Sequence, residues 1–123
     1  MSEALVPRVL KILFGRGGAP KWVIEPGANR DNDAMQVVVR KRQEIQWKRQ
    51  QGNDDTPFTI EFDDPEAGTP FSNWDGLLSK TSGGPQNIVT GIVSESDDLD
   101  VVYKYSVKVT GKKTLDPMII MDK

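Results

Sequence analysis

Residues 101–110 read Val-Val-Tyr-Lys-Tyr-Ser-Val-Lys-Val-Thr, and their side chains alternate between apolar and polar. The single exception is Val102, which falls among the polar positions. Successive side chains of a strand point to opposite faces of a sheet, so the alternation predicts a strand with one apolar and one wetter face. Residues 111–113 interrupt the pattern, and residues 114–121 resume it as a second, more apolar strand. These two predicted strands indicate a β-sheet protein.

Similar short stretches recur toward the N-terminus, separated by turn-forming residues. We expect further strands at residues 5–14, 21–25, 35–40, 44–48, 57–62 and 87–93. Residues 29–33 are predicted to be a polar loop, and Gly91 to mark a bulge or a close backbone approach. Residues 63–85 are rich in Gly and Pro, with a single helical turn expected near residues 74–78. Seven or eight short strands without a long helix favour an all-β, antiparallel two-sheet sandwich or an open barrel.

Length and composition limit what the chain does. Its 123 residues, with no repeat or linker, predict a single β-sandwich domain over residues 1–123. The chain holds neither cysteine nor histidine. Those residues supply thiolate nucleophiles, the commonest general base and most ligands of zinc, copper and haem. We therefore expect no metal site, no cofactor and no enzymatic activity.

Charge and hydropathy limit the partners. The net charge is -2, from 16 basic and 18 acidic residues, which favours neither nucleic acid nor an anionic membrane surface. No apolar run reaches the roughly 18 residues of a membrane span. The N-terminal residues lack the pattern of a secretory signal, so a cytoplasmic setting is the expectation.

Two resemblances follow from the strand patterns. Residues 44–49 (Glu-Ile-Gln-Trp-Lys-Arg), a polar loop and residues 56–62 (Thr-Pro-Phe-Thr-Ile-Glu-Phe) resemble the middle of a cupredoxin-type sandwich. Residues 103–109 and 117–121 resemble its two closing strands, so the likeness covers residues 44–121. With this likeness the expected fold is an immunoglobulin-like or cupredoxin-like sandwich. The copper chemistry does not carry over, because cupredoxins bind copper through two histidines and a cysteine.

The chain is also similar to small bacterial proteins of the DP-EP type. In that group a tyrosine-rich strand and a short loop precede Leu-Asp-Pro and an aliphatic strand. The corresponding residues here are Tyr103, Tyr105, Leu115, Asp116 and Pro117, with Glu25 and Pro26 upstream. This resemblance implies a fold and no activity.

Acidic and basic residues gather in clusters that have two interpretations each. Acidic groups lie at residues 31–33, 54–55, 63–66 and 95–100. They could bind Ca²⁺, or serve as the carboxylate pair of a hydrolase, but none has EF-hand spacing and solvated loops are favoured. Basic residues crowd positions 40–42 and 48–49, where guards on strand edges are favoured over a nucleic-acid patch.

The tryptophans provide the candidate contact site. Trp22 and Trp47 lie in predicted strands and are expected to fill the core. Trp74 lies in the irregular segment near Phe71, and loops carry function on sandwich scaffolds. We take Phe71, Trp74 and Asp75 as candidate contacts to a ligand or partner.

The favoured function is a non-catalytic interaction or assembly module that binds itself or another protein through a sheet face or edge. The alternative is a sandwich that binds a small molecule or carbohydrate through residues 63–85, and a hydrolase with a carboxylate pair is third.

Overall fold

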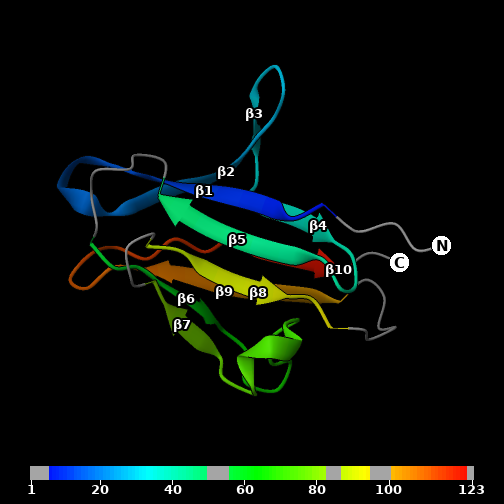
Figure 1. Cartoon of the computed structure of the whole chain (residues 1–123). Coiled ribbons are helices and arrows are strands. Elements are labelled where there is room, and N and C mark those ends of the chain that lie inside the picture. The colour runs from blue at the N-terminus through cyan, green and yellow to red at the C-terminus, as the bar shows by residue number, and fades with distance from the viewer. Residues whose placement is uncertain (1–5, 50–55, 83–86, 95–100, 122–123) are drawn as a thin grey trace.

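Two five-stranded sheets form the molecule in the computed structural model, which describes residues 6–49, 56–82, 87–94 and 101–121 (Figure 1). The first sheet has the order β3 (Asp31–Asp33), β2 (Pro20–Pro26), β1 (Arg8–Phe14), β5 (Glu44–Arg49), β8 (Val89–Ile92). The second has the order β4 (Gln36–Val39), β10 (Met118–Met121), β9 (Val102–Lys108), β6 (Thr59–Phe62), β7 (Ser79–Thr81). Two short 3₁₀ turns complete the described elements, η1 (Arg16–Gly18) and η2 (Ser72–Trp74). Neither of these turns could cross a lipid bilayer.

The predicted all-β sandwich is confirmed, and each of the eight expected strands has a counterpart. The expectation of purely antiparallel sheets is wrong, because β1 pairs with β5 and β4 with β10 in parallel. Each parallel pair joins strands that are distant in the sequence. A local hydrophobic pattern carries no information about the direction of such a distant partner.

Ten strands replace the seven or eight expected. Residues 31–33, predicted as a loop, form β3 at the edge of the first sheet, and residues 79–81 form β7 at the edge of the second. Both strands have three residues, too few to show alternation. The helical turn expected at residues 74–78 is instead the 3₁₀ turn η2, which begins earlier and ends at Trp74.

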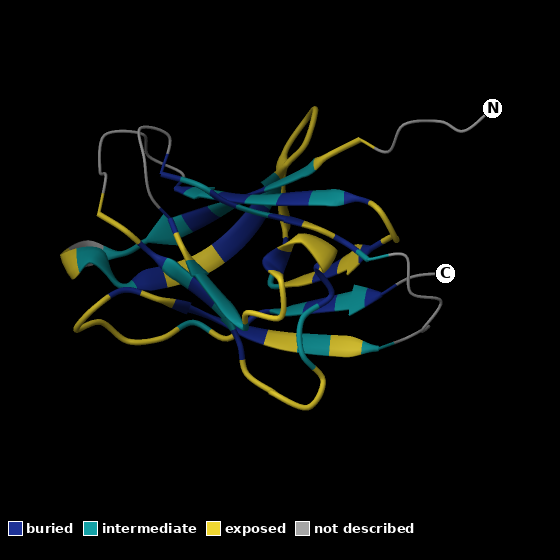
Figure 2. Cartoon of the chain, turned by 60° about the horizontal axis from the view of Figure 1, so that its bottom comes forward, coloured by how far each residue is buried: buried dark blue, intermediate teal, exposed yellow. Residues whose placement is uncertain are grey.

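One hydrophobic cluster fills the space between the sheets. Figure 2 shows buried residues interspersed with more exposed ones along the strands, and the period of two is strict in β4, β5 and β6. On β9, Tyr105 and Val107 are fully buried and Val109 nearly so, which confirms the apolar face of residues 101–110. At the centre, the Trp47 Nε1–H donates to the Tyr105 hydroxyl at 3.1 Å, and the rings meet edge to face at 5.4 Å.

Burial of the Tyr105 phenol makes stability sensitive to alkaline pH. Burial raises the pKa of the Tyr105 phenol above its ordinary value of 10.0. As pH rises past about 10, the unfolded chain loses this proton while the folded chain keeps it, so the free energy of unfolding falls. Tyr105→Phe should cost about 1–3 kcal/mol near neutral pH, because the buried indole N–H loses its acceptor. Urea unfolding at neutral pH and at about pH 11 should show a smaller alkaline loss in the variant than in the parent. An identical alkaline loss in both would contradict the burial of the phenol.

Candidate functional site

The predicted contact residues Phe71 and Trp74 lie in the core. Trp74 is 0% exposed and Phe71 5%, and their ring centroids are 5.0 Å apart. Both rings also pack 5.6 Å from the Phe62 ring. The prediction that Trp74 presents a stacking ring is therefore wrong, since no ring face is open to a sugar. Asp75 alone of the three is exposed, in the left-handed conformation that ends η2.

Residues 72–74 have a structural task instead. The Trp74 Nε1–H donates to the Thr90 carbonyl at 2.8 Å, and the Asn73 side-chain oxygen accepts the Ile92 N–H at 2.8 Å. The Ser72 hydroxyl donates to the Ile92 carbonyl at 3.4 Å. The 3₁₀ turn thus covers the outer edge of β8 and occupies backbone groups that would otherwise be open to another strand.

Trp22 also differs from its prediction. It lies opposite Leu13 on the outer face of the first sheet and is 44% exposed, so the prediction that it fills the core is wrong. Its neighbour Val23 is the inward residue. The Trp22 indole N–H donates to the Asp33 carboxylate at 3.2 Å across to β3. Trp47, by contrast, is fully buried as predicted.

The basic and acidic clusters of the sequence have different surroundings in the fold. β5 is a central strand, so the interpretation of residues 48–49 as edge guards is wrong. Arg49 is 9% exposed, and its guanidinium lies 3.8 Å from the centre of the Phe14 ring. Among the residues with described positions, no three acidic side chains come together to hold a metal ion. The acidic residues 54–55 and 95–100 lie outside the described ranges.

The outer face of the second sheet is the candidate functional site. Pairing sets its outward-directed side chains in four rows across the strands. From the end nearest the chain termini, the rows are Val38–Ile120–Val102, Gln36–Met118–Lys104, Ser106–Glu61–Ser79 and Lys108–Thr59–Thr81. The face therefore changes from aliphatic at one end to hydroxyl-rich and cationic at the other.

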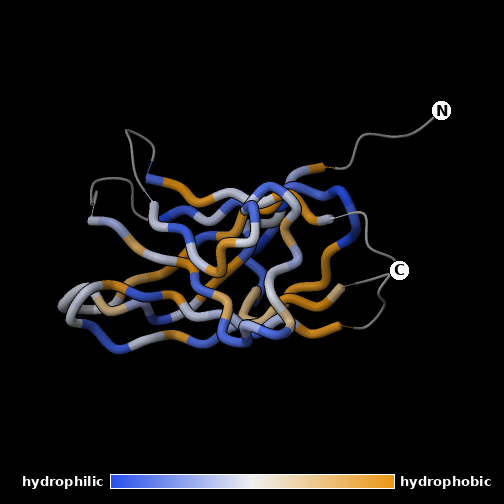
Figure 3. Tube along the Cα trace, turned by 90° about the horizontal axis from the view of Figure 1, so that it is seen from below, coloured by the Kyte–Doolittle hydropathy of each residue, from blue (hydrophilic) through white to orange (hydrophobic). Residues whose placement is uncertain are grey.

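The aliphatic row, Val38–Ile120–Val102, is the apolar end. Val38 is 46% and Val102 44% exposed, and Ile120 lies half-buried between them. Figure 3 shows hydrophobic stretches at the right-hand ends of several strands, where buried and exposed positions are coloured alike. Val102 is the residue that broke the alternation in the sequence. The sequence pattern therefore indicated that Val102 is exposed. Only the pairing of three strands places it beside Val38 and Ile120.

A hydrogen-bonded polar band crosses the middle of the face. The Ser106 hydroxyl is buried and donates to Asp63 Oδ1 at 2.6 Å, with Asp116 Oδ1 3.3 Å away. Lys108 forms an ion pair with Glu61 on the neighbouring strand, and this hydrogen bond raises the pKa of the Lys108 ammonium. Asp116, singled out by the DP-EP resemblance, thus belongs to this band.

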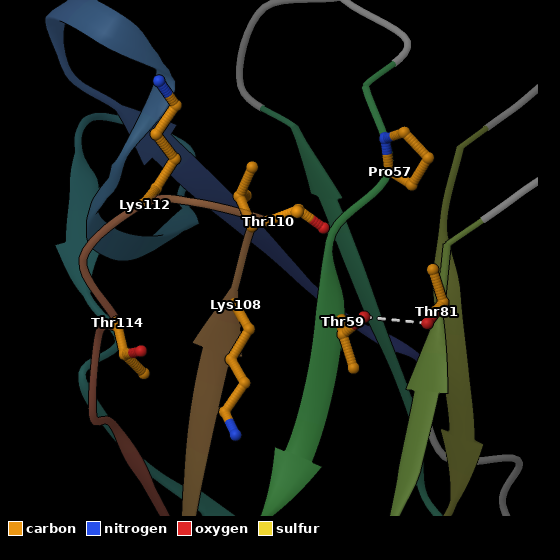
Figure 4. A pocket seen from close by; sticks show the side chains of 8 residues that line it. Pro57, Thr59, Thr81, Lys108, Thr110, Lys112 and Thr114 are labelled. Atoms are coloured by element: carbon orange, nitrogen blue, oxygen red, sulfur yellow. Dashed lines mark hydrogen bonds between the residues drawn. The ribbon is translucent and has the colours of Figure 1, made fainter.

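An open groove of about 420 Å³ lies at the other end of the face (Figure 4). It is lined by Pro57, Thr59, Thr81, Lys108, Val109, Thr110, Lys112 and Thr114. We call it the threonine–lysine groove. Nothing in the local sequence pattern identified it, since its residues come from the ends of three strands and one loop.

Hydrogen bonds hold the segments that line the groove. The Thr56 carbonyl accepts from Arg49 Nε at 2.9 Å and from Asn87 Nδ2 at 3.2 Å, which fixes the chain just before Pro57. The Thr59 and Thr81 hydroxyls are 2.8 Å apart and hydrogen-bonded.

The loop on the opposite wall is a tight turn. The Lys112 N–H donates to the Val109 carbonyl at 3.0 Å, and Gly111 has a φ of 76°, which suits glycine. The turn presents Thr110 and Lys112 to the groove.

Comparison with known proteins adds no family. No protein-family model matches the chain, and no curated protein matches it.

Proposed function

We propose that the chain is a non-catalytic interaction module that associates with a second copy of itself through the aliphatic row. The supporting observation is the exposure of Val38 and Val102 on either side of Ile120, in register across three adjacent strands. The remaining rows of that face carry polar and charged side chains, apart from Met118. Clustered apolar surface with a polar surround is typical of a protein contact.

A face is favoured over an edge because the edge strands are guarded. The Arg8 guanidinium donates to the Val38 carbonyl on β4 at 2.9 Å, and η2 covers β8. β3 and β7 have only three residues each, and β3 carries Asp31 and Asp33. Short, charged and covered edges discourage strand addition.

A second copy suits the chemistry of this face. In a twofold interface the same patch meets itself, so an apolar row contacts the partner's apolar row. Beyond this row the face carries Lys104 and Lys108 as well as Glu61 and Asp63, so it bears charges of both signs. Three side chains bury less surface area than the roughly 1,200 Å² of the smallest stable interfaces. We therefore expect a weak, concentration-dependent dimer.

Val102→Lys should weaken this dimer by about tenfold or more, because the new charge is desolvated against its symmetry mate. Sedimentation velocity over a wide concentration range measures the dissociation constant. The matched control is Ile92→Lys, which replaces an aliphatic side chain of 42% exposure on the outer face of the first sheet. It should leave the dimer unchanged. A parent chain that stays monomeric at every concentration, or equal effects of the two variants, would overturn the proposal.

We also propose that the resemblance to cupredoxins extends to the whole sandwich. Constant-type immunoglobulin domains have two antiparallel sheets. The parallel pairing of β1 with β5 and of β4 with β10 supports the cupredoxin-like alternative.

A further inference from the structure

We propose that the threonine–lysine groove binds an acidic oligosaccharide, a chain of sugars that carries carboxylate or sulfate groups. The groove lies on the same sheet as the aliphatic row but at its opposite end, so this inference does not depend on the proposed dimer. Four threonine hydroxyls and two lysine ammonium groups line it, with Pro57 and Val109 as its apolar residues.

The arrangement of the cations suits an extended ligand. Figure 4 shows the Lys112 and Lys108 side chains pointing away from each other, with Thr110 between them and Thr59 on the strand next to Lys108. Ammonium groups that point apart suit a ligand with several anionic groups better than a single small anion. A chain with anionic groups along its length can place one group near each lysine, where charge-assisted hydrogen bonds form.

Size and openness agree with a chain rather than an enclosed small molecule. A volume of about 420 Å³ lies within the 300–1,000 Å³ of ordinary ligand sites. The groove is partly open to solvent, so a ligand need not be enclosed by it.

The lining favours an acidic sugar over other polyanions. Hydroxyl groups both donate and accept, as the vicinal hydroxyls of a sugar require, and four threonines provide them. None of the described residues that line the groove is aromatic, which disfavours neutral sugars that stack and single-stranded nucleic acid. An acidic peptide added as a strand needs a long free edge, whereas the neighbouring edge strand β7 has three residues.

The ion pair between Lys108 and Glu61 sets the affinity. The Glu61 carboxylate competes with a bound anion for the Lys108 ammonium, and it also repels that anion. Lys112 has no carboxylate partner among the ion pairs of the described residues. Lys112 should therefore contribute more to binding than Lys108 does in the parent chain, and Glu61→Gln should strengthen binding by releasing Lys108.

Isothermal titration with a heparin-derived hexasaccharide tests the proposal, with its desulfated form and hexaglutamate as comparison ligands. We expect binding of the sulfated sugar at low salt that weakens as salt rises. Lys112→Gln should weaken it at least fivefold, and Glu61→Gln should strengthen it at least twofold. The control Lys104→Gln removes an exposed lysine from the same sheet outside the groove and should change affinity less than twofold.

Three outcomes would overturn the proposal: no binding of the sulfated hexasaccharide, equal losses in Lys112→Gln and Lys104→Gln, or hexaglutamate binding as tightly as the sugar. Equal losses would mean diffuse attraction to surface charge. Tight binding of hexaglutamate would mean that the groove recognises acidic chains of another class. Thermal melts of each variant establish that all are folded, so a loss of binding is not a loss of structure.

Discussion

Trp74→Ala should lower the free energy of unfolding by about 3–5 kcal/mol, the usual cost of truncating a fully buried aromatic side chain. Trp74 is 0% exposed and packs against Phe62 and Phe71 at centroid distances of 5.6 and 5.0 Å. Its indole N–H also donates to the Thr90 carbonyl, so the substitution removes the cover of the β8 edge. The variant loses core packing and a buried hydrogen bond together.

The three tryptophans offer an internal control. Urea unfolding followed by circular dichroism measures each variant. Trp22→Ala should cost less than about 1 kcal/mol, because the side chain is 44% exposed and its hydrogen bond to Asp33 lies at the surface. Trp74→Phe should fall between the two, since it keeps a ring and loses the N–H. Similar costs for Trp22→Ala and Trp74→Ala would contradict the burial of Trp74.

Gly91→Ala should lower the free energy of unfolding by about 2–3 kcal/mol, through overpacking. A Cβ at this position would lie 2.5 Å from Cγ and 2.7 Å from both Cδ atoms of the Phe71 ring. The ring cannot withdraw easily, because Trp47, Phe62 and Trp74 pack within 5.7 Å of its centre. The close approach predicted at Gly91 from the sequence is thus a contact between the β8 backbone and an aromatic ring.

A second substitution separates this contact from a general effect of alanine. Phe71→Leu removes ring atoms from the crowded position, so Gly91→Ala should cost about 1 kcal/mol less in that background. Gly15→Ala is the matched control, because its added Cβ would have no neighbour closer than 3.9 Å. It should change stability by about 0.5 kcal/mol or less. Additive effects of Gly91→Ala and Phe71→Leu would refute the proposed clash.

Hydrophobic alternation predicted the strands well and their partners poorly. Residues 57–62 show this: Phe58, Ile60 and Phe62 were predicted to point inward, and each is at most 2% exposed. The period of two reports a property of one strand and one interface, so a single sequence displays it. The pairing of β4 with β10 joins Gln36 to Met118, far apart in the sequence, and neither strand contains a signal for the other.

The tryptophans show why the candidate site could not be predicted from the sequence. Trp22 was assigned to the core because it lies in a strand, and Trp74 to the surface because it lies in a loop. A strand has two faces, and the phase of β2 puts Val23 inward and Trp22 outward. The loop that holds Trp74 folds back over the edge of β8, where the indole finds a backbone acceptor.

By itself the sequence determined that the chain forms β-strands with one apolar face and that it lacks the side chains of histidine and cysteine chemistry. Both properties are local, because they depend on residue identity and on the period of side-chain direction. The tertiary structure alone decided which side chains meet: the row of Val38, Ile120 and Val102 and the groove between Thr59, Thr110 and Lys112. Those groupings depend on the order and register of strands from distant parts of the chain, which only the packing of both sheets around one core specifies.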